Sequence, residues 1–164
     1  MAATKTPITT ELAQKNITIL RDVKSSGTEG GGFTSGSWQT RDLNTIETYG
    51  KTVCSLSSNQ FTLTPGKYYI EATAPAYAVG RNQARLQNIT DSSTEILGSS
   101  EYVNTTIGAV TTSKIIGVFT ITKNTTFEIQ HQCETTRTTN GFGIYSGFGN
   151  DSVYTQVKIE QIQE

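Results

Sequence analysis

Alternation of side-chain type over strand-length segments is the feature that most restricts the fold of this chain. In residues 16–24, and again in residues 153–161, every second side chain falls on the same face, which is the period of a half-buried β-strand. A helix start is visible only at Thr10, and the residues after it support no more than one turn. The sequence therefore predicts an all-β protein, with further extended segments at 33–43, 52–56, 61–63, 68–74, 83–89, 94–97, 114–121 and 125–132.

The composition excludes several other classes of protein. Of the 164 residues, 29 are threonine, a β-branched residue that suits pleated, half-exposed strands. Only 16% are charged and the net charge is −1, which argues against a helical bundle, a coiled coil, a basic nucleic-acid-binding protein and an acidic disordered chain. No apolar run approaches the ~20 residues that span a bilayer, and no signal peptide is visible. We expect a protein that folds in the cytosol, without membrane insertion and without nucleic-acid partners.

Two parts of the chain are expected. Residues 1–15 form a short polar N-terminal arm for attachment, and residues 16–164 form a single domain. About eight to ten short strands predict an antiparallel β-sandwich, for which the two-sheet jelly roll is the leading candidate and a barrel the alternative. Pro65 and Gly66 favour a type II turn, and residues 122–124 suit a hairpin connection.

Two local features raise the question of an interface between subunits. Residues 115–119 are apolar on both faces, so they form either a central strand covered by a loop or a strand with one face in a trimer interface, through Ile116 and Val118. Trp38, Arg41 and Asp42 are further interface candidates. The Arg41–Asp42 pair is either a solvated surface pair or a device that orients an assembly through the planar guanidinium.

Several segments resemble known proteins. Residues 61–72, Phe-Thr-Leu-Thr-Pro-Gly-Lys-Tyr-Tyr-Ile-Glu-Ala, resemble the hairpin of tumour necrosis factor/complement-type jelly rolls, in which an aromatic residue, a glycine turn and a tyrosine-rich strand recur. A closer resemblance is to small bacteriophage virion proteins and to the C-terminal domains of phage tail fibres. It covers roughly residues 17–162 and is carried by residues 30–44, 57–61, 74–77 and 138–142.

This resemblance implies a homotrimeric jelly roll on a phage particle, made in the host cytoplasm and located in the virion. Its partners would be further copies of itself and other virion proteins of the capsid shell or tail. A capsid decoration, or cement, protein is the first expectation, because so short a chain lacks the long shaft of an ordinary tail fibre. The alternative is a tail-fibre or spike module that contacts host surface glycans.

The aromatic-rich segment 135–151 is the sequence's best candidate for glycan recognition. Aromatic faces stack on sugar C–H surfaces, while amide and guanidinium groups bind hydroxyls. The same residues could instead close the end of the sandwich or pack around a trimer axis. The candidates are Arg137, Asn140, Phe142, Tyr145, Phe148 and Asn150.

Residues that could support catalysis or metal binding are few and poorly spaced. His131 and Cys133 share a strand face, but a metal site would need a third ligand such as Cys54, and no typical ligand spacing is present. The acidic residues are scattered, so no carboxylate pair for glycan cleavage can be assigned. We expect no catalytic residue, no metal and no cofactor, and two cysteines that are reduced and buried.

Overall fold

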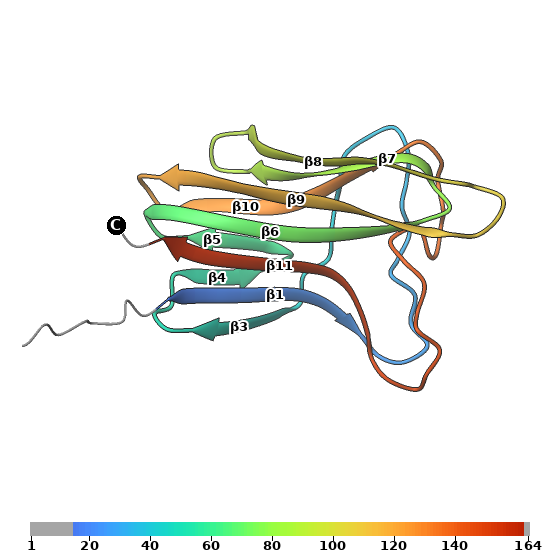
Figure 1. Cartoon of the computed structure of the whole chain (residues 1–164), viewed down its shortest axis with the longest axis horizontal. Helices are drawn as coiled ribbons and strands as arrows, with labels where there is room; N and C mark the ends of the chain where they lie inside the picture. Colours follow the sequence, from blue (N-terminus) through green and yellow to red (C-terminus); the bar gives the residue numbers. More distant parts are fainter. Residues whose placement is uncertain (1–14, 163–164) are drawn as a thin grey trace, which may run out of the picture.

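The computed structural model describes residues 15–162, so the predicted arm, apart from Lys15, lies outside the described residues. Within them the chain forms two stacked antiparallel sheets, with short turns at one end and long loops at the other (Figure 1). The strands are β1 (Asn16–Lys24), β2 (Gln39–Thr40), β3 (Thr45–Tyr49), β4 (Cys54–Ser57), β5 (Gln60–Leu63), β6 (Gly66–Tyr77), β7 (Gly80–Asn88), β8 (Ser93–Val103), β9 (Val110–Ile121), β10 (Thr125–Cys133) and β11 (Ser152–Ile162).

The strand order is that of a jelly roll. One sheet, here called the β1 sheet, has the order β3-β1-β11-β6-β9. The other, the β10 sheet, has the order β4-β5-β10-β7-β8, and β2 pairs with β10 at its side. The chain passes repeatedly from one sheet to the other, and all neighbouring strands are antiparallel. The predicted all-β sandwich is therefore confirmed, with eleven strands in the described residues instead of eight to ten.

The connections at residues 64–66 and 122–124 differ from the type II turn and the hairpin that the sequence predicts. β5 and β6 lie in different sheets, so Thr64 and Pro65 arch across the sandwich and do not close a hairpin. Gly66 has a φ of 157°, far from the value of about +80° that a type II turn requires. Residues 122–124 likewise connect β9 to β10 across the two sheets. Turn residues indicate that the chain changes direction. Which sheet the next strand joins depends on its pairing with strands distant in the sequence.

The hairpin between β4 and β5 had no clear sequence signal. Ser58 and Asn59 occupy its tip with φ of 51° and 66°, as a two-residue type I′ turn needs. The extended segment expected at 33–43 contains only the two-residue β2 and an isolated bridge between Phe33 and Arg137. Most of that segment lies at the surface, and Phe33, Arg41 and Leu43 are the side chains that it buries.

The core has two parts. The larger lies between the sheets and includes Tyr68, Phe61, Phe127 and Ile159. The smaller lies under the long loops and is formed by Phe33, Ala76, Val79, Val103, Cys133 and Phe142. The smaller cluster ties the loops to the sandwich, since Phe33 stacks on Phe142 with ring centroids 4.6 Å apart.

Gly30 and Gly32 are required where the loops meet. A Cβ on Gly30 would lie 2.7 Å from the carbonyl carbon of Phe142, and one on Gly32 would lie 2.7 Å from the carbonyl oxygen of Thr138. No side chain fits at such distances. Two backbone segments therefore approach each other closely at these glycines.

Arg41 is the largest fully buried side chain of the domain. Its Nε donates to Thr155 Oγ1 at 2.8 Å, and its two terminal nitrogens donate to the carbonyl oxygens of Pro75 and Phe142, each at 3.0 Å. The guanidinium carbon also lies 3.9 Å from the centroid of the Phe142 ring. Arg41 thus joins the segment before β3 to β6, to β11 and to the loop before β11.

The charge of Arg41 is balanced inside the domain. Burial lowers the pKa of Arg41, and the negative charges of Asp22 and Asp42 oppose that lowering. Lys24 Nζ lies 3.0 Å from Asp22 Oδ1 and 2.7 Å from Asp42 Oδ2. Two positive and two negative groups therefore gather at this end of β1, where an uncompensated charge would be costly.

His131 is also fully buried, and its environment suits only the neutral ring. Nε2 lies 3.0 Å from Asn82 Oδ1 and donates to it, while Nδ1 has no hydrogen-bond partner among residues 15–162. Burial, and secondarily the positive charge of Arg41, hold the pKa of His131 well below its usual value. Protonation would place a second N–H where no described acceptor can receive it.

Acid should therefore weaken the fold through His131. Below about pH 6.5 the unfolded chain binds a proton that the folded chain does not, so the free energy of unfolding falls by up to about 1.4 kcal/mol per pH unit. Denaturant unfolding between about pH 7 and 5 would measure this slope in the wild type and in His131→Gln, which keeps a donor toward Asn82. The raised pKa of the buried Asp22 carboxyl acts in the opposite direction in both proteins. Equal slopes would contradict this role of His131.

Candidate functional surfaces

The outer face of the β1 sheet carries an apolar surface that crosses all five strands. In one row, Tyr49, Ile17, Tyr69 and Val118 lie in register, with Glu160 between Ile17 and Tyr69. In the next row, Ile19 on β1 and Ile116 on β9 are in register with Glu47, Lys158 and Glu71. We call the six hydrophobic residues the apolar face: Ile17, Ile19, Tyr49, Tyr69, Ile116 and Val118.

Ile116 and Val118 are the two residues of the apolar face that lie on β9, and both are largely exposed. They are 55% and 54% exposed, whereas Ile115 and Phe119 on either side of them point into the core. Gly117 also faces inward, where the side chain of Ile96 leaves no room for a Cβ. Of the two alternatives for residues 115–119, the central strand covered by a loop is wrong, because β9 is an edge strand and no loop among residues 15–162 covers its outer side.

Most charges within the apolar face, with the exception of Glu71, are paired. Glu160 lies 2.8 Å from Lys15 Nζ and 3.8 Å from Lys158 Nζ, and Arg21 contacts Glu47. These ion pairs lower the pKa of Glu160 and of Glu47. The face therefore presents hydrophobic side chains and a nearly neutral set of charges.

The other three interface candidates lie elsewhere. Trp38 rests on the β10 sheet, where the Arg85 guanidinium lies 4.1 Å from its ring centroid. Arg41 is 0% exposed, so the assembly role and the solvated-surface role expected of it are both corrected: its donors are used inside the domain. Asp42 is half-buried and paired with Lys24, not with Arg41. A buried arginine was missed because its partners, Thr155 and Phe142, are more than a hundred positions away.

The segment 135–151 divides into a packed part and an open part. Phe142 is buried against Phe33 and Arg41, so its expected glycan contact is corrected to a core role. Arg137 is half-buried, and its guanidinium donates to the carbonyl oxygens of Ala78 and Thr105. Asn140 is half-buried as well, and its carbonyl accepts from the Gly143 amide at 3.0 Å.

The open part is the loop 144–151. Phe148 is 85% exposed, between Gly147 and Gly149, whose φ angles of 74° and 81° are left-handed. Tyr145 is 41% exposed, and its backbone amide donates to Glu29. Asn150 is exposed too. Of the six glycan candidates, Tyr145, Phe148 and Asn150 thus remain available on a surface.

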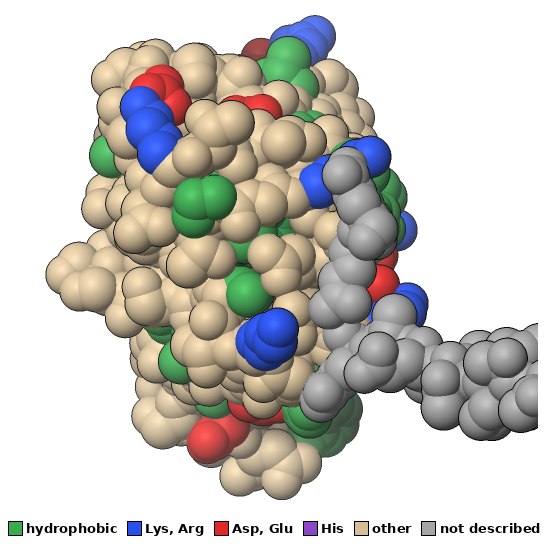
Figure 2. Space-filling view, turned by 90° about the vertical axis from the view of Figure 1, so that its left-hand side faces the viewer, with side chains coloured by type: hydrophobic (Ala, Val, Ile, Leu, Met, Phe, Trp, Pro, Cys, Tyr) green, Lys and Arg blue, Asp and Glu red, His purple; other side chains and the backbone are tan. Residues whose placement is uncertain are grey.

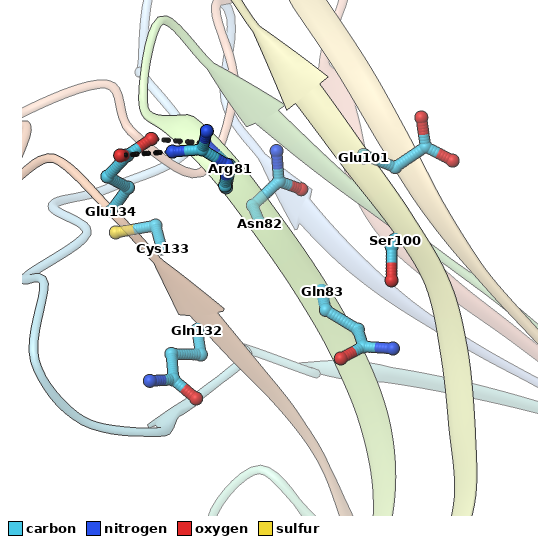
Figure 3. Close-up of a pocket in the computed structure, with 8 residues that line it drawn as sticks. All are labelled: Arg81, Asn82, Gln83, Ser100, Glu101, Gln132, Cys133 and Glu134. Atoms are coloured by element: carbon cyan, nitrogen blue, oxygen red, sulfur yellow. Dashed lines mark hydrogen bonds and ion pairs between the residues drawn. The ribbon is translucent and has the colours of Figure 1, made fainter.

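The opposite end of the sandwich offers no comparable surface. This is the end with the short turns 64–65 and 122–124, and Figure 2 shows mainly neutral polar side chains and backbone there, with scattered charges. A groove of about 390 Å³ lies on the outer face of the β10 sheet, where β7, β8 and β10 meet. Figure 3 shows its lining, which includes Arg81, Gln83, Ser100, Gln132 and Glu134.

The residues considered for metal binding are not brought together. Cys54 belongs to the larger core cluster and Cys133 to the smaller one. No three His, Cys, Asp or Glu side chains among residues 15–162 form a group that could hold a metal ion. Burial raises the pKa of Cys54 to about 12 and that of Cys133 to about 11. Both cysteines are free and buried, as expected.

In the described part of the chain no helix is long and apolar enough to cross a membrane.

Comparisons with known proteins identify the fold. No family model matches the chain, and no curated protein matches its sequence. Among solved structures, the globular domain of zebrafish complement 1qA protein superposes with a TM-score of 0.57 and 16% identity, over 92% of this chain and 98% of that one. Murine APRIL at pH 5.0 superposes with a TM-score of 0.57 and 8% identity, over 91% of this chain and 100% of that one. The domain has the jelly-roll fold of the complement C1q and tumour necrosis factor type.

Proposed function

We propose that this protein is a structural component of a bacteriophage particle, a homotrimeric jelly roll displayed on the capsid as a decoration, or cement, protein. The observation that carries the assembly is the apolar face. Ile116 and Val118 each expose more than half of their surface on a regular strand, and hydrophobic side chains gathered on one face and bordered by polar ones are typical of interaction surfaces. The place on a phage particle is supported by the sequence resemblance described above.

A ring of three copies is the arrangement that the apolar face favours. The face runs across the whole β1 sheet, from Tyr49 on β3 to Val118 on β9. A repeated heterologous contact about a three-fold axis buries such a face in every copy and leaves no open end. Aromatic side chains are enriched in the buried parts of interfaces, and the apolar face has Tyr49 and Tyr69. The Glu160–Lys158 pair on the central strand β11 would enter the interface as a neutral pair, whereas the Arg21–Glu47 pair lies toward the β3 edge.

The N-terminal segment is proposed as the attachment to the particle. β1 begins at Asn16, at the end of the sandwich seen in Figure 2. The sequence of the preceding residues shows no strand pattern, so we do not expect the sandwich to need them. The long loops lie at the far end, and this polarity suits a protein held at one end and displayed at the other.

Two measurements test this proposal. Light scattering at micromolar concentration should give a mass close to three times 17.8 kDa, and quantitative mass spectrometry of purified particles should give hundreds of copies per particle. A monodisperse mass of 17.8 kDa would contradict the trimer, and absence of the chain from particles would contradict the virion role.

The second candidate function is a tail-fibre or spike module that contacts host surface glycans. The exposed Phe148 and Tyr145 on the loop 144–151 favour it, because an aromatic ring held out by flanking glycines is available for stacking. A few trimers per particle would support this alternative over capsid decoration.

A further inference from the structure

We propose that the outer face of the β10 sheet binds a neutral saccharide in the groove lined by Arg81, Gln83, Ser100 and Gln132, next to Tyr102. This site is separate from the apolar face and from the loop 144–151, and it does not depend on the assembly proposed above. Nothing in the sequence pointed to it, because its residues come from three strands.

The register of the sheet arranges these side chains as two rows. Tyr102 on β8 pairs with Arg81 on β7, and two residues further along Ser100 pairs with Gln83, which in turn pairs with Gln132 on β10. Neighbouring strands are about 4.8 Å apart, and residues two positions apart on one strand are about 6.7 Å apart. Hydrogen-bonding groups at such spacings match the hydroxyls around a sugar ring. In Figure 3, Gln132, Gln83 and Ser100 come from three adjacent strands, β10, β7 and β8.

The groove is the part of this face where polar groups are left without partners. The side chains of Ser100 and Gln132 make no hydrogen bond to the described residues, and Gln83 uses only Nε2, which donates to the Gly98 carbonyl at 2.9 Å. The neighbouring part of the same face is satisfied. There Arg85 donates to Gln130 Oε1 at 2.8 and 2.6 Å and lies against Trp38. In the groove, Ser100, Gln132 and Gln83 Oε1 can therefore bind a ligand without breaking a hydrogen bond within the described residues.

The charge of the groove favours a neutral ligand. The Arg81 guanidinium is already paired with Glu134 at 2.7 Å, and the backbone amide of Arg81 donates to the same carboxylate at 3.0 Å. Glu101 adds a second carboxylate to the lining. One positive and two negative groups repel an anion, whereas the free N–H groups of Arg81 can still donate to hydroxyl oxygens.

Tyr102 supplies the apolar contact that sugars require. It is 64% exposed and pairs with Arg81 across β7 and β8, so an exposed aromatic side chain stands next to the groove, and such a ring can stack on the C–H groups of a sugar. The groove volume of about 390 Å³ falls at the small end of the range of about 300–1,000 Å³ for small-molecule sites. A small saccharide, or one unit of a longer glycan, is therefore the expected occupant.

Titrating the ¹⁵N-labelled full chain with methyl glycosides of glucose, galactose and N-acetylglucosamine tests the proposal. At least one should shift the backbone amide resonances of Gln83, Ser100 and Gln132 saturably, and methyl glucuronide should bind more weakly. Tyr102→Ala and Gln132→Ala should each weaken binding about tenfold, equivalent to about 1.4 kcal/mol. The matched controls Tyr145→Ala and Phe148→Ala should bind as the wild type does.

Three results would overturn the proposal: no saturable shift with any of the neutral sugars, shifts confined to the loop 144–151, or tighter binding of the glucuronide. The oligomeric mass is measured separately on the same samples. A monomer that binds sugar through the groove would refute the trimer and keep this site, and a trimer without binding would do the reverse.

Discussion

Replacing Arg41 with methionine is expected to destabilise the fold by about 3–5 kcal/mol. Methionine fills much of the space but leaves Thr155 Oγ1 and the carbonyl oxygens of Pro75 and Phe142 without their donors. It also removes a positive charge close to the buried Asp22. Taking one partner out of a buried charged network leaves the others uncompensated, which is far more costly than losing an exposed ion pair.

Denaturant unfolding of wild type and Arg41→Met would measure this loss. Arg81→Met is a matched control, since the Arg81 side chain is 78% exposed in its ion pair with Glu134, and it should leave the unfolding midpoint nearly unchanged. Arg41→Lys should also be clearly destabilising, because an ammonium cannot reproduce three donors in the plane of the guanidinium. A loss below about 1 kcal/mol for Arg41→Met would contradict the structural role of this network.

Placing aspartate at Ile116 or Val118 is expected to convert the proposed trimer into a folded monomer. Both side chains point away from the core, so an exposed carboxylate there is tolerated in the isolated domain. In a dry interface the same carboxylate has no partner, and its desolvation opposes association. Light scattering should report a threefold fall in mass, while circular dichroism and the unfolding midpoint at low concentration should stay close to those of a folded domain.

Leu97→Asp provides the control for this experiment. Leu97 is 59% exposed on β8, on the opposite sheet, so aspartate there should leave the mass of the trimer unchanged. If Ile116→Asp and Val118→Asp both keep the wild-type mass, the apolar face is not the interface. If Leu97→Asp dissociates the assembly instead, the interface lies on the β10 sheet.

The segment that carries the strongest sequence resemblance, residues 30–44, is largely structural. Gly30 and Gly32 allow the loops to pack, Phe33 fills the smaller core cluster, and Arg41 holds three elements together. A resemblance in such residues is evidence for a shared fold. The surfaces that would meet a particle or a glycan lie on other residues, and they need the experiments above.

Local patterns determined the elements of this protein. The alternation in residues 16–24 and 153–161 predicted β1 and β11 to within one residue at each end, because side-chain period is a property of a single strand. The double-sided apolar pattern of residues 115–119 correctly indicated an uncovered hydrophobic face on β9. β3 was missed, since Thr45–Tyr49 lies at a sheet edge, where alternation is not enforced by burial.

The pairing of distant residues was decided only by the tertiary structure. In β1 the inward face carries Thr18 and Asp22, while Ile17 and Ile19 lie on the outer side, because the neighbouring strands and Arg41 set which face is core. Phe142 became a core residue through Phe33, more than a hundred positions away. The saccharide groove likewise exists only because β7, β8 and β10 align Gln83, Ser100 and Gln132. The alternation of side chains is a property of a single strand and can be read from its sequence. Which face is buried, which charges are paired and which residues form a groove depend on the register between strands that are distant in sequence, so local patterns do not predict them.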